Sequence, residues 1–266
     1  MTDLCLYEVR DGVAVVTLNR PERNNGMTGA LELAYFARLA EAAEDRDARA
    51  VVVTGAGRSF CPGADLANRP EPGDEPLPNT KVLTTFPLTI GKPLVAAING
   101  GCAGVGLVQA LQCDVRFAAT QAKFTTAFAR RGLIAEYGIA WLLPRIVGQS
   151  AATDLLLSAR VFDAAEALRI GLVSAVVDRD EVLDTAMAYA RDVAANVSPA
   201  SMATIKEQLR RYQTTSLDEA VADSKELMRQ STQGPDFREG VDSYLEGRPP
   251  AFLPLGEGTT YPWMKD

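Results

Sequence analysis

The chain has 266 residues, of which 47% are hydrophobic, and a formal net charge of −7. This length allows one large core, or a core with a smaller appendage, and the acidic balance argues against nucleic acid as a partner. No apolar run reaches the length of a membrane span and no charged-then-apolar leader opens the chain, so we expect a cytoplasmic protein without membrane contact. The four cysteines, Cys5, Cys61, Cys102 and Cys113, show no metal-binding spacing. We expect them to be reduced and buried, and we expect no metal site.

The chain contains no histidine. This excludes every catalytic scheme in which histidine activates a serine or cysteine nucleophile, and every general base that is a histidine. It also removes the commonest metal ligand. Proton transfer would have to come from a carboxylate, lysine, tyrosine or cysteine.

Short apolar runs alternate with helical stretches through the first two thirds of the chain. The predicted strands are Val13–Leu18, Ala50–Thr54, Leu94–Ile98 and Val115–Ala118. The predicted helices among them are Gly29–Glu44 and Leu107–Gln112. Repeating strand–helix units of this kind predict an α/β fold with buried parallel strands.

After Pro199 the pattern changes to helices alone. We predict helices over Ala200–Tyr212, Leu217–Arg229 and Pro235–Leu245. The chain therefore divides into an α/β part, 1–199, and a helical part, 200–266. Periodicity alone leaves open whether these helices cap the core or join subunits.

Two glycine-bearing segments carry the strongest chemical signal, Ser59–Leu66 (SFCPGADL) and Ile98–Asp114 (INGGCAGVGLVQALQCD). Small residues allow a ligand to approach the backbone and leave N–H groups available. Gly104 and Gly106 flank Val105 before an apolar run, which would place the Val105 N–H at a helix N-terminus. Two N–H donors from separate loops suit a carbonyl oxygen that becomes negative during a reaction.

Arg69–Thr80 (RPEPGDEPLPNT) follows the first of these segments and is rich in proline and acidic residues. Its composition fits an exposed loop. Its position also fits a mobile cover over a binding pocket. The sequence supports both interpretations.

The two glycine segments, in this order and with this separation, resemble the enoyl-CoA hydratase/isomerase (crotonase) family. Further segments that resemble family landmarks in the same order are Leu18–Met27, Phe128–Gly148, Ala164–Gly171 and Asp236–Phe252. The resemblance implies a spiral of ββα units, followed by C-terminal helices that assemble a homotrimer or a dimer of trimers. It implies an acyl-CoA thioester as substrate, with no permanently bound cofactor.

The resemblance also assigns roles to individual residues. The backbone N–H groups of Ala64 and Val105 would form the oxyanion hole. Arg23 would meet the CoA phosphates, and Phe252 resembles tail residues near the nucleotide. The backbone of Ala64, Asp65 and Leu66 would hold the adenine and pantetheine.

The acidic residues at the expected active site depart from the hydratase pattern. Val108 and Phe128 stand where hydratases of this family carry their two glutamates, and neither side chain can ionise. Glu136 falls where Δ3,Δ2-enoyl-CoA isomerases carry a single catalytic glutamate. Val108, Phe128, Tyr137 and Trp141 would then line the substrate pocket, with Tyr137 able to orient Glu136.

These residues favour a Δ3,Δ2-enoyl-CoA isomerase that acts through a thioester enolate. Two alternatives remain open: another reaction of the family, such as thioester hydrolysis or decarboxylation, and a CoA-thioester-binding protein without catalysis. The position of Glu136 discriminates between the isomerase and the binding protein. An enzyme requires its carboxylate near the Ala64 and Val105 amides, whereas a binding protein allows it to face solvent.

Overall fold

The computed structural model describes residues 3–68 and 84–264. The larger of its two sheets has the strand order β1-β2-β3-β5-β7-β10. These strands are β1 (Cys5–Arg10), β2 (Val13–Leu18), β3 (Ala50–Gly55), β5 (Leu94–Ile98), β7 (Val115–Ala119) and β10 (Ala175–Val177). β1 pairs antiparallel with β2, and the remaining pairs are parallel. The central strands β3 and β5 are buried along their whole length, as expected of parallel strands covered on both faces.

A smaller sheet has the order β4-β6-β8-β9. Its strands are β4 (Ser59–Cys61), β6 (Gly101–Ala103), β8 (Lys123–Thr125) and β9 (Phe162–Asp163). Consecutive strands enter alternate sheets: β3 is followed by β4, β5 by β6 and β7 by β8. Each turn of the chain thus contributes one strand to each sheet. This confirms the predicted α/β spiral.

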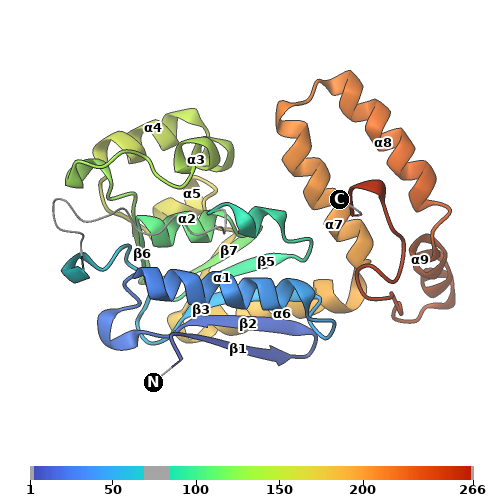
Figure 1. The fold of residues 1–266 in the computed structure, drawn as a ribbon, viewed down its shortest axis with the longest axis horizontal. Helices are drawn as coiled ribbons and strands as arrows, with labels where there is room; N and C mark the ends of the chain where they lie inside the picture. The colour runs from blue at the N-terminus through green and yellow to red at the C-terminus, as the bar shows by residue number, and fades with distance from the viewer. Residues whose placement is uncertain (1–2, 69–83, 265–266) are drawn as a thin grey trace.

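Helices cover both faces of the larger sheet (Figure 1). The helices of this part are α1 (Gly29–Glu44), α2 (Val105–Leu111), α3 (Ile139–Val147), α4 (Gln149–Ser158), α5 (Ala164–Arg169) and α6 (Val182–Asn196). Alternate side chains of β2 point to opposite faces of the sheet and pack into different layers. Ala14 and Val16 belong to the core cluster that includes α1, whereas Val13 and Val15 pack with α6.

The last three helices extend from the core to one side (Figure 1), and the chain then returns towards the core. They are α7 (Pro199–Arg211), α8 (Leu217–Ser231) and α9 (Pro235–Glu246). The Lys206 ammonium of α7 donates to the Asp114 carboxylate at 2.6 Å and to the Lys92 carbonyl at 2.8 Å, which attaches α7 to the core. The division at residues 199 and 200 stays a prediction. Among the described helices, none combines the length and apolarity that crossing a membrane requires.

Candidate active site

Two glycine turns bring the loop after β4 against the loop after β6. Gly63 and Gly104 have φ values of +105° and +51°, which side-chain-bearing residues rarely adopt. A Cβ on Gly63 would lie 3.2 Å from the Ala103 carbonyl oxygen, and a Cβ on Gly104 would lie 3.7 Å from the Gly63 Cα. A Cβ on Gly106 would overlap the carbonyl and side chain of Cys61. The glycines therefore permit this close approach.

The approach leaves two backbone N–H groups available. The Met27 N–H donates to the Gly63 carbonyl at 2.8 Å, and the Asp65 N–H donates to the Met27 carbonyl at 2.8 Å. These two hydrogen bonds fix the residues on either side of Ala64. Alternate groups of an extended segment point to opposite sides, which turns the Ala64 N–H away from Met27. Val105 is the first residue of α2. Within residues 3–68 and 84–264, neither the Ala64 nor the Val105 N–H has a hydrogen-bond acceptor.

Both residues line a cavity of about 170 Å³ between these turns, the start of α1 and the segment before α3. Six residues singled out in the sequence line it: Ala64, Leu66, Val105, Phe128, Glu136 and Tyr137. Other walls come from Met27, Thr28, Gly29, Glu32, Pro62, Gly63, Gly104, Ala127, Arg131 and Leu133. The fold thus brings Glu136 to the same cavity as the two predicted oxyanion donors.

The backbone beside Glu136 adopts an uncommon conformation. Tyr137 has a φ of +52° and Ala127, on the same cavity wall, has a φ of +64°. Non-glycine residues in the left-handed region store strain of roughly 1–3 kcal/mol, and such strain concentrates at functional sites. Burial, aided by the negative charges of Glu32 and Glu136, raises the pKa of Tyr137 to about 12. Its hydroxyl therefore stays protonated at neutral pH and can donate a hydrogen bond.

Two residues predicted to line the pocket lie elsewhere. Val108 is buried in the core behind Val105 and is not among the described residues of the cavity wall. Trp141 is 39% exposed, and the Arg145 guanidinium stacks 3.9 Å from the centre of its ring. Ile139 and Leu142 take the core-facing side of α3, which leaves Trp141 on its outer side. Trp141 is therefore absent from the described wall of this cavity, and its role in the substrate pocket stays a prediction.

The residues predicted to bind CoA are only partly at the cavity. Asp65 forms an ion pair with Arg20 at 3.1 Å, and the hydrogen bond from Arg20 lowers the pKa of Asp65. Arg23 lies exposed in the turn after β2. Phe252 is buried near the chain end, where its carbonyl accepts a hydrogen bond from Arg49 at 2.8 Å. Among the described residues of the cavity wall, neither Arg23 nor Phe252 is present.

Glu32 is the acidic wall residue that sequence reasoning missed. It lies in the first turn of α1, on the helix face that carries the buried Tyr35, Phe36 and Leu39. Its spacing of three, four and seven residues from these side chains places it on the apolar stripe of the helix. A charged residue on such a stripe is the sequence signal that would have identified it.

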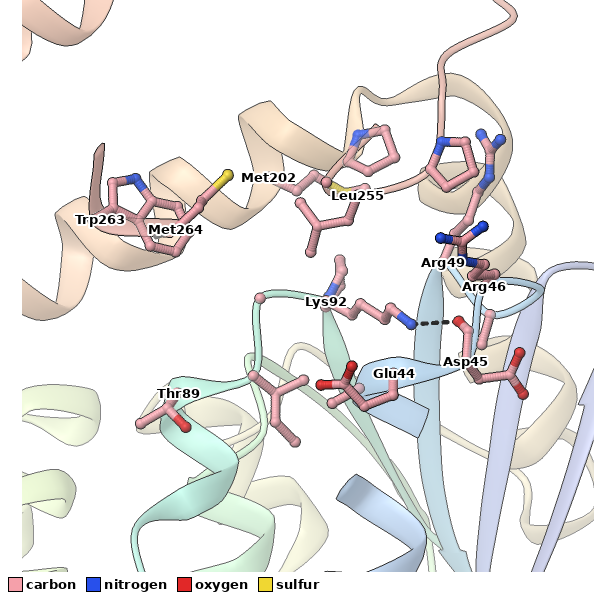
Figure 2. Close-up of a pocket in the computed structure, with 18 of the residues that line it drawn as sticks. Glu44, Asp45, Arg46, Arg49, Thr89, Lys92, Met202, Leu255, Trp263 and Met264 are labelled. Atoms are coloured by element: carbon pink, nitrogen blue, oxygen red, sulfur yellow. Dashed lines mark hydrogen bonds between the residues drawn. The ribbon is translucent and has the colours of Figure 1, made fainter. Parts of the chain in front are cut away.

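A larger cavity, of about 510 Å³, lies where the chain end returns to the core (Figure 2). Its cations have partners: Lys92 donates to the carbonyls of Ala42 at 2.7 Å and Asp45 at 2.6 Å. Arg46 pairs with Glu257 at 3.0 Å, and Arg49 bonds the tail at Phe252. Figure 2 shows Lys92 pointing towards Asp45 beneath Met202 and Leu255. Arg46 and Arg49 thus attach the chain end to the core, whereas Lys92 joins the segment before β5 to the end of α1.

The four cysteines take no part in the site. All are buried and free, as predicted. Burial raises the pKa of Cys61 and of Cys113 to about 12, so their thiolates do not form near neutral pH. Nucleophilic catalysis by these thiols is therefore disfavoured.

The chain is similar to known proteins in both sequence and fold. The enoyl-CoA hydratase/isomerase family model matches residues 8–254. The 1,2-epoxyphenylacetyl-CoA isomerase of Escherichia coli K12 is 34% identical over 95% of this chain and 99% of its own. The chain belongs to the enoyl-CoA hydratase/isomerase family. A solved probable enoyl-CoA hydratase/isomerase from Mycobacterium abscessus superposes with a TM-score of 0.88 at 31% identity, covering 94% of this chain and 99% of the other.

The enoyl-CoA hydratase/isomerase family is a family of enzymes. An acyl-CoA substrate is consistent with membership of this family. The names of relatives include hydratases as well as isomerases. A structure described as a monofunctional enoyl CoA isomerase from M. smegmatis superposes with a TM-score of 0.71 at 36% identity, covering 83% of this chain and 99% of the other. Family membership alone therefore does not select the reaction.

Proposed function

We propose that the protein is a Δ3,Δ2-enoyl-CoA isomerase in which Glu136 is the single proton-transferring base. One observation carries this proposal: Glu136 lines the same cavity as Ala64 and Val105. The positions that hold catalytic glutamates in hydratases of this family are Val108 and Phe128, which cannot activate water. An isomerase needs one carboxylate and an oxyanion hole, and Glu136 with the Ala64 and Val105 N–H groups would supply both from this wall.

The reaction moves one proton and one double bond. The thioester oxygen of a 3-enoyl-CoA accepts hydrogen bonds from the Ala64 and Val105 N–H groups. The Glu136 carboxylate removes a proton from C2, and the charge moves onto the thioester oxygen as a dienolate. The protonated Glu136 returns the proton to C4, which leaves a double bond between C2 and C3. Proton and charge balance without an added reagent.

Apolar residues around the cavity support this chemistry. Phe128 is buried, whereas Leu66 and Leu133 are exposed, at 55% and 48%, and offer apolar surface that an acyl chain would cover. With the acyl chain bound, this apolar surface would exclude water, which would otherwise compete for the dienolate. Arg23, on an exposed turn, would meet the CoA phosphates outside the cavity, while the backbone of Ala64–Leu66 would hold the adenine and pantetheine.

Incubation with matched CoA thioesters tests the proposal. We expect conversion of 3-enoyl-CoA to 2-enoyl-CoA, followed by ultraviolet absorbance and mass, and very slow hydration of 2-enoyl-CoA. Loss of one positioned acid–base group lowers the rate roughly 10²–10⁴-fold. Both glutamates of the hydratase pattern are missing here. Hydration at ordinary hydratase rates, or inertness towards 3-enoyl-CoA of every chain length, would contradict the proposal.

We also propose that α7, α8 and α9 join subunits into a homotrimer or a dimer of trimers. Large apolar side chains stand exposed on these helices: Ile205, Leu209, Leu217, Val221, Met228, Phe237, Tyr244 and Leu245. Apolar surface on this scale is typical of an interface. Light scattering at micromolar concentration should give three or six copies, and a stable monomer would contradict this part of the proposal.

A further inference from the structure

The inference concerns Glu32, which faces the candidate active site from the first turn of α1. Its side chain lines the cavity together with Ala64, Val105 and Glu136. The Glu32 Oε1 atom is buried and has no hydrogen-bond partner within residues 3–68 and 84–264. Burying an oxygen without a partner is unfavourable, so this arrangement calls for a partner from elsewhere.

The interaction of the Glu32 carboxyl group with the Tyr137 hydroxyl leaves the Oε1 atom unpaired, and no described ion pair or helix cap supplies its partner. Within the described chain Glu32 joins no ion pair, and Arg131 on the same cavity wall donates to the Ala127 carbonyl at 3.2 Å instead. The N-cap of α1 is already formed by the Thr28 hydroxyl, which accepts from the Leu31 N–H at 3.2 Å. Capping of α1 therefore does not account for the buried oxygen.

The chemistry of the Glu32 carboxyl group defines what such a partner can be. Burial raises the pKa of Glu32, and a hydrogen-bonding interaction with the Tyr137 hydroxyl works in the opposite direction. In either protonation state the carboxyl group has an oxygen that accepts a hydrogen bond. Glu32 therefore suits a hydroxyl group on the ligand, which can donate to the buried Oε1 atom and is uncharged at neutral pH.

We propose that Glu32 recognises a hydroxyl group carried by the acyl chain, so that the preferred substrates are acyl-CoA thioesters with a hydroxyl group beyond the α-carbon. This inference rests on the proposed acyl-CoA function, because it assigns the polar partner of Glu32 to the ligand in the same cavity. Sites built to hydrogen-bond a substrate group discriminate strongly against analogues that lack it, since the protein group is then left unpaired.

Calorimetric binding of three ligands tests the proposal: butyryl-CoA, 3-hydroxybutyryl-CoA and 4-hydroxybutyryl-CoA. Mass spectrometry after each titration confirms that the ligand is unchanged. We expect the wild type to bind at least one hydroxylated ligand about tenfold more tightly than butyryl-CoA, the contribution of one well-formed hydrogen bond. Glu32→Leu should abolish that preference while keeping the affinity for butyryl-CoA.

Two further variants control the test. Glu32→Gln should retain part of the preference, because an amide both donates and accepts, and this rescue separates hydrogen bonding from proton transfer. Glu44→Leu, at the exposed other end of α1, should leave the preference intact. Circular dichroism establishes that each variant is folded.

The outcomes separate this inference from the proposed function. Equal affinity of the wild type for all three ligands, or a preference that persists in Glu32→Leu, overturns the role of Glu32 and leaves the acyl-CoA site standing. Absence of binding for every thioester overturns the proposed function, and the inference with it.

Discussion

The two cavities differ in a way that their sizes do not reveal. The larger, at about 510 Å³, contains several charges, yet Lys92, Arg46 and Arg49 are all bound by carbonyl or carboxylate oxygens. The smaller, at about 170 Å³, contains groups without described partners: the Ala64 and Val105 amides and the Glu32 Oε1 atom. Unpartnered polar groups at a cavity, rather than volume, are what distinguish a site prepared for a ligand from a joint between segments.

This difference has an energetic basis. A polar group that is already paired gains little from a ligand, because a new hydrogen bond must replace an existing one. A buried polar group without a partner carries an unfavourable free energy that a ligand can relieve. The proposed site therefore belongs at the smaller cavity, while the paired groups of the larger cavity contribute to folding.

The largest expected effect is that of Glu136→Gln. The amide keeps the shape of the cavity but cannot accept the C2 proton, so we expect kcat to fall roughly 10²–10⁴-fold with little change in thioester affinity. Steady-state isomerase kinetics and calorimetric binding measure the two quantities. Glu44→Gln, on the wall of the larger cavity, is the matched control and should retain wild-type kcat. An unchanged rate in Glu136→Gln would remove Glu136 from the mechanism.

The next effect is on stability, at the turn that presents Val105. Gly106→Ala places a Cβ within overlap distance of the Cys61 carbonyl and side chain, and overpacking of this kind costs about 1–3 kcal/mol. Gly101→Ala is the matched control, since its Cβ would meet only the Ser59 hydroxyl at 3.7 Å, an ordinary contact. Urea unfolding should separate the two variants. Equal stability would mean that the loops separate without cost.

A third prediction concerns the larger cavity. Lys92→Met leaves the Ala42 and Asp45 carbonyls without their shared donor, and loss of hydrogen bonds from a charged group costs about 2 kcal/mol. We expect a lower urea midpoint together with a kcat close to that of the wild type. A fall in kcat with unchanged stability would instead assign the larger cavity a part in catalysis.

Local sequence signals predicted most of the fold. The β-branched runs identified β2 and β5 at their true limits, and the apolar stripe between Thr28 and Asp45 identified α1. The strands of the smaller sheet were not predicted, because β4 and β6 have three residues each and show no periodicity. They exist because the larger sheet and α2 hold them side by side, which is a tertiary effect.

The candidate site was predictable where backbone chemistry defines it. Gly63 and Gly104 indicated close approach of two loops, and the structure places Ala64 and Val105 on one cavity wall. Side-chain direction was less predictable. Trp141 and Tyr137 lie four residues apart, yet the left-handed Tyr137 and Gly138 turn the chain between them and send the two side chains to different surfaces. Such a reversal depends on backbone angles that residue patterns do not reveal.

The smallest effect is a pH-dependent difference between Glu32→Gln and the wild type. Burial raises the pKa of Glu32 in the folded protein above the ordinary value of 4.5. Below that value Glu32 is protonated in both the folded and the unfolded state, and its ionisation costs nothing. As pH rises, the unfolded chain loses its proton first, so the wild type loses stability until the folded-state pKa has also been passed.

Glutamine does not ionise. The stability of Glu32→Gln relative to the wild type should therefore increase as pH rises from 4 to 8. Tyr137, Glu136 and Arg131, which line the same cavity, are common to both proteins, so their titration largely cancels in the difference. Urea unfolding at each pH, with Glu44→Gln as the reference, measures the difference in unfolding free energy between Glu32→Gln and the wild type. If this stability advantage of Glu32→Gln shrinks with rising pH, the ionised carboxylate is favoured at the N-terminus of α1. Burial would then not dominate the ionisation of Glu32 in the folded protein.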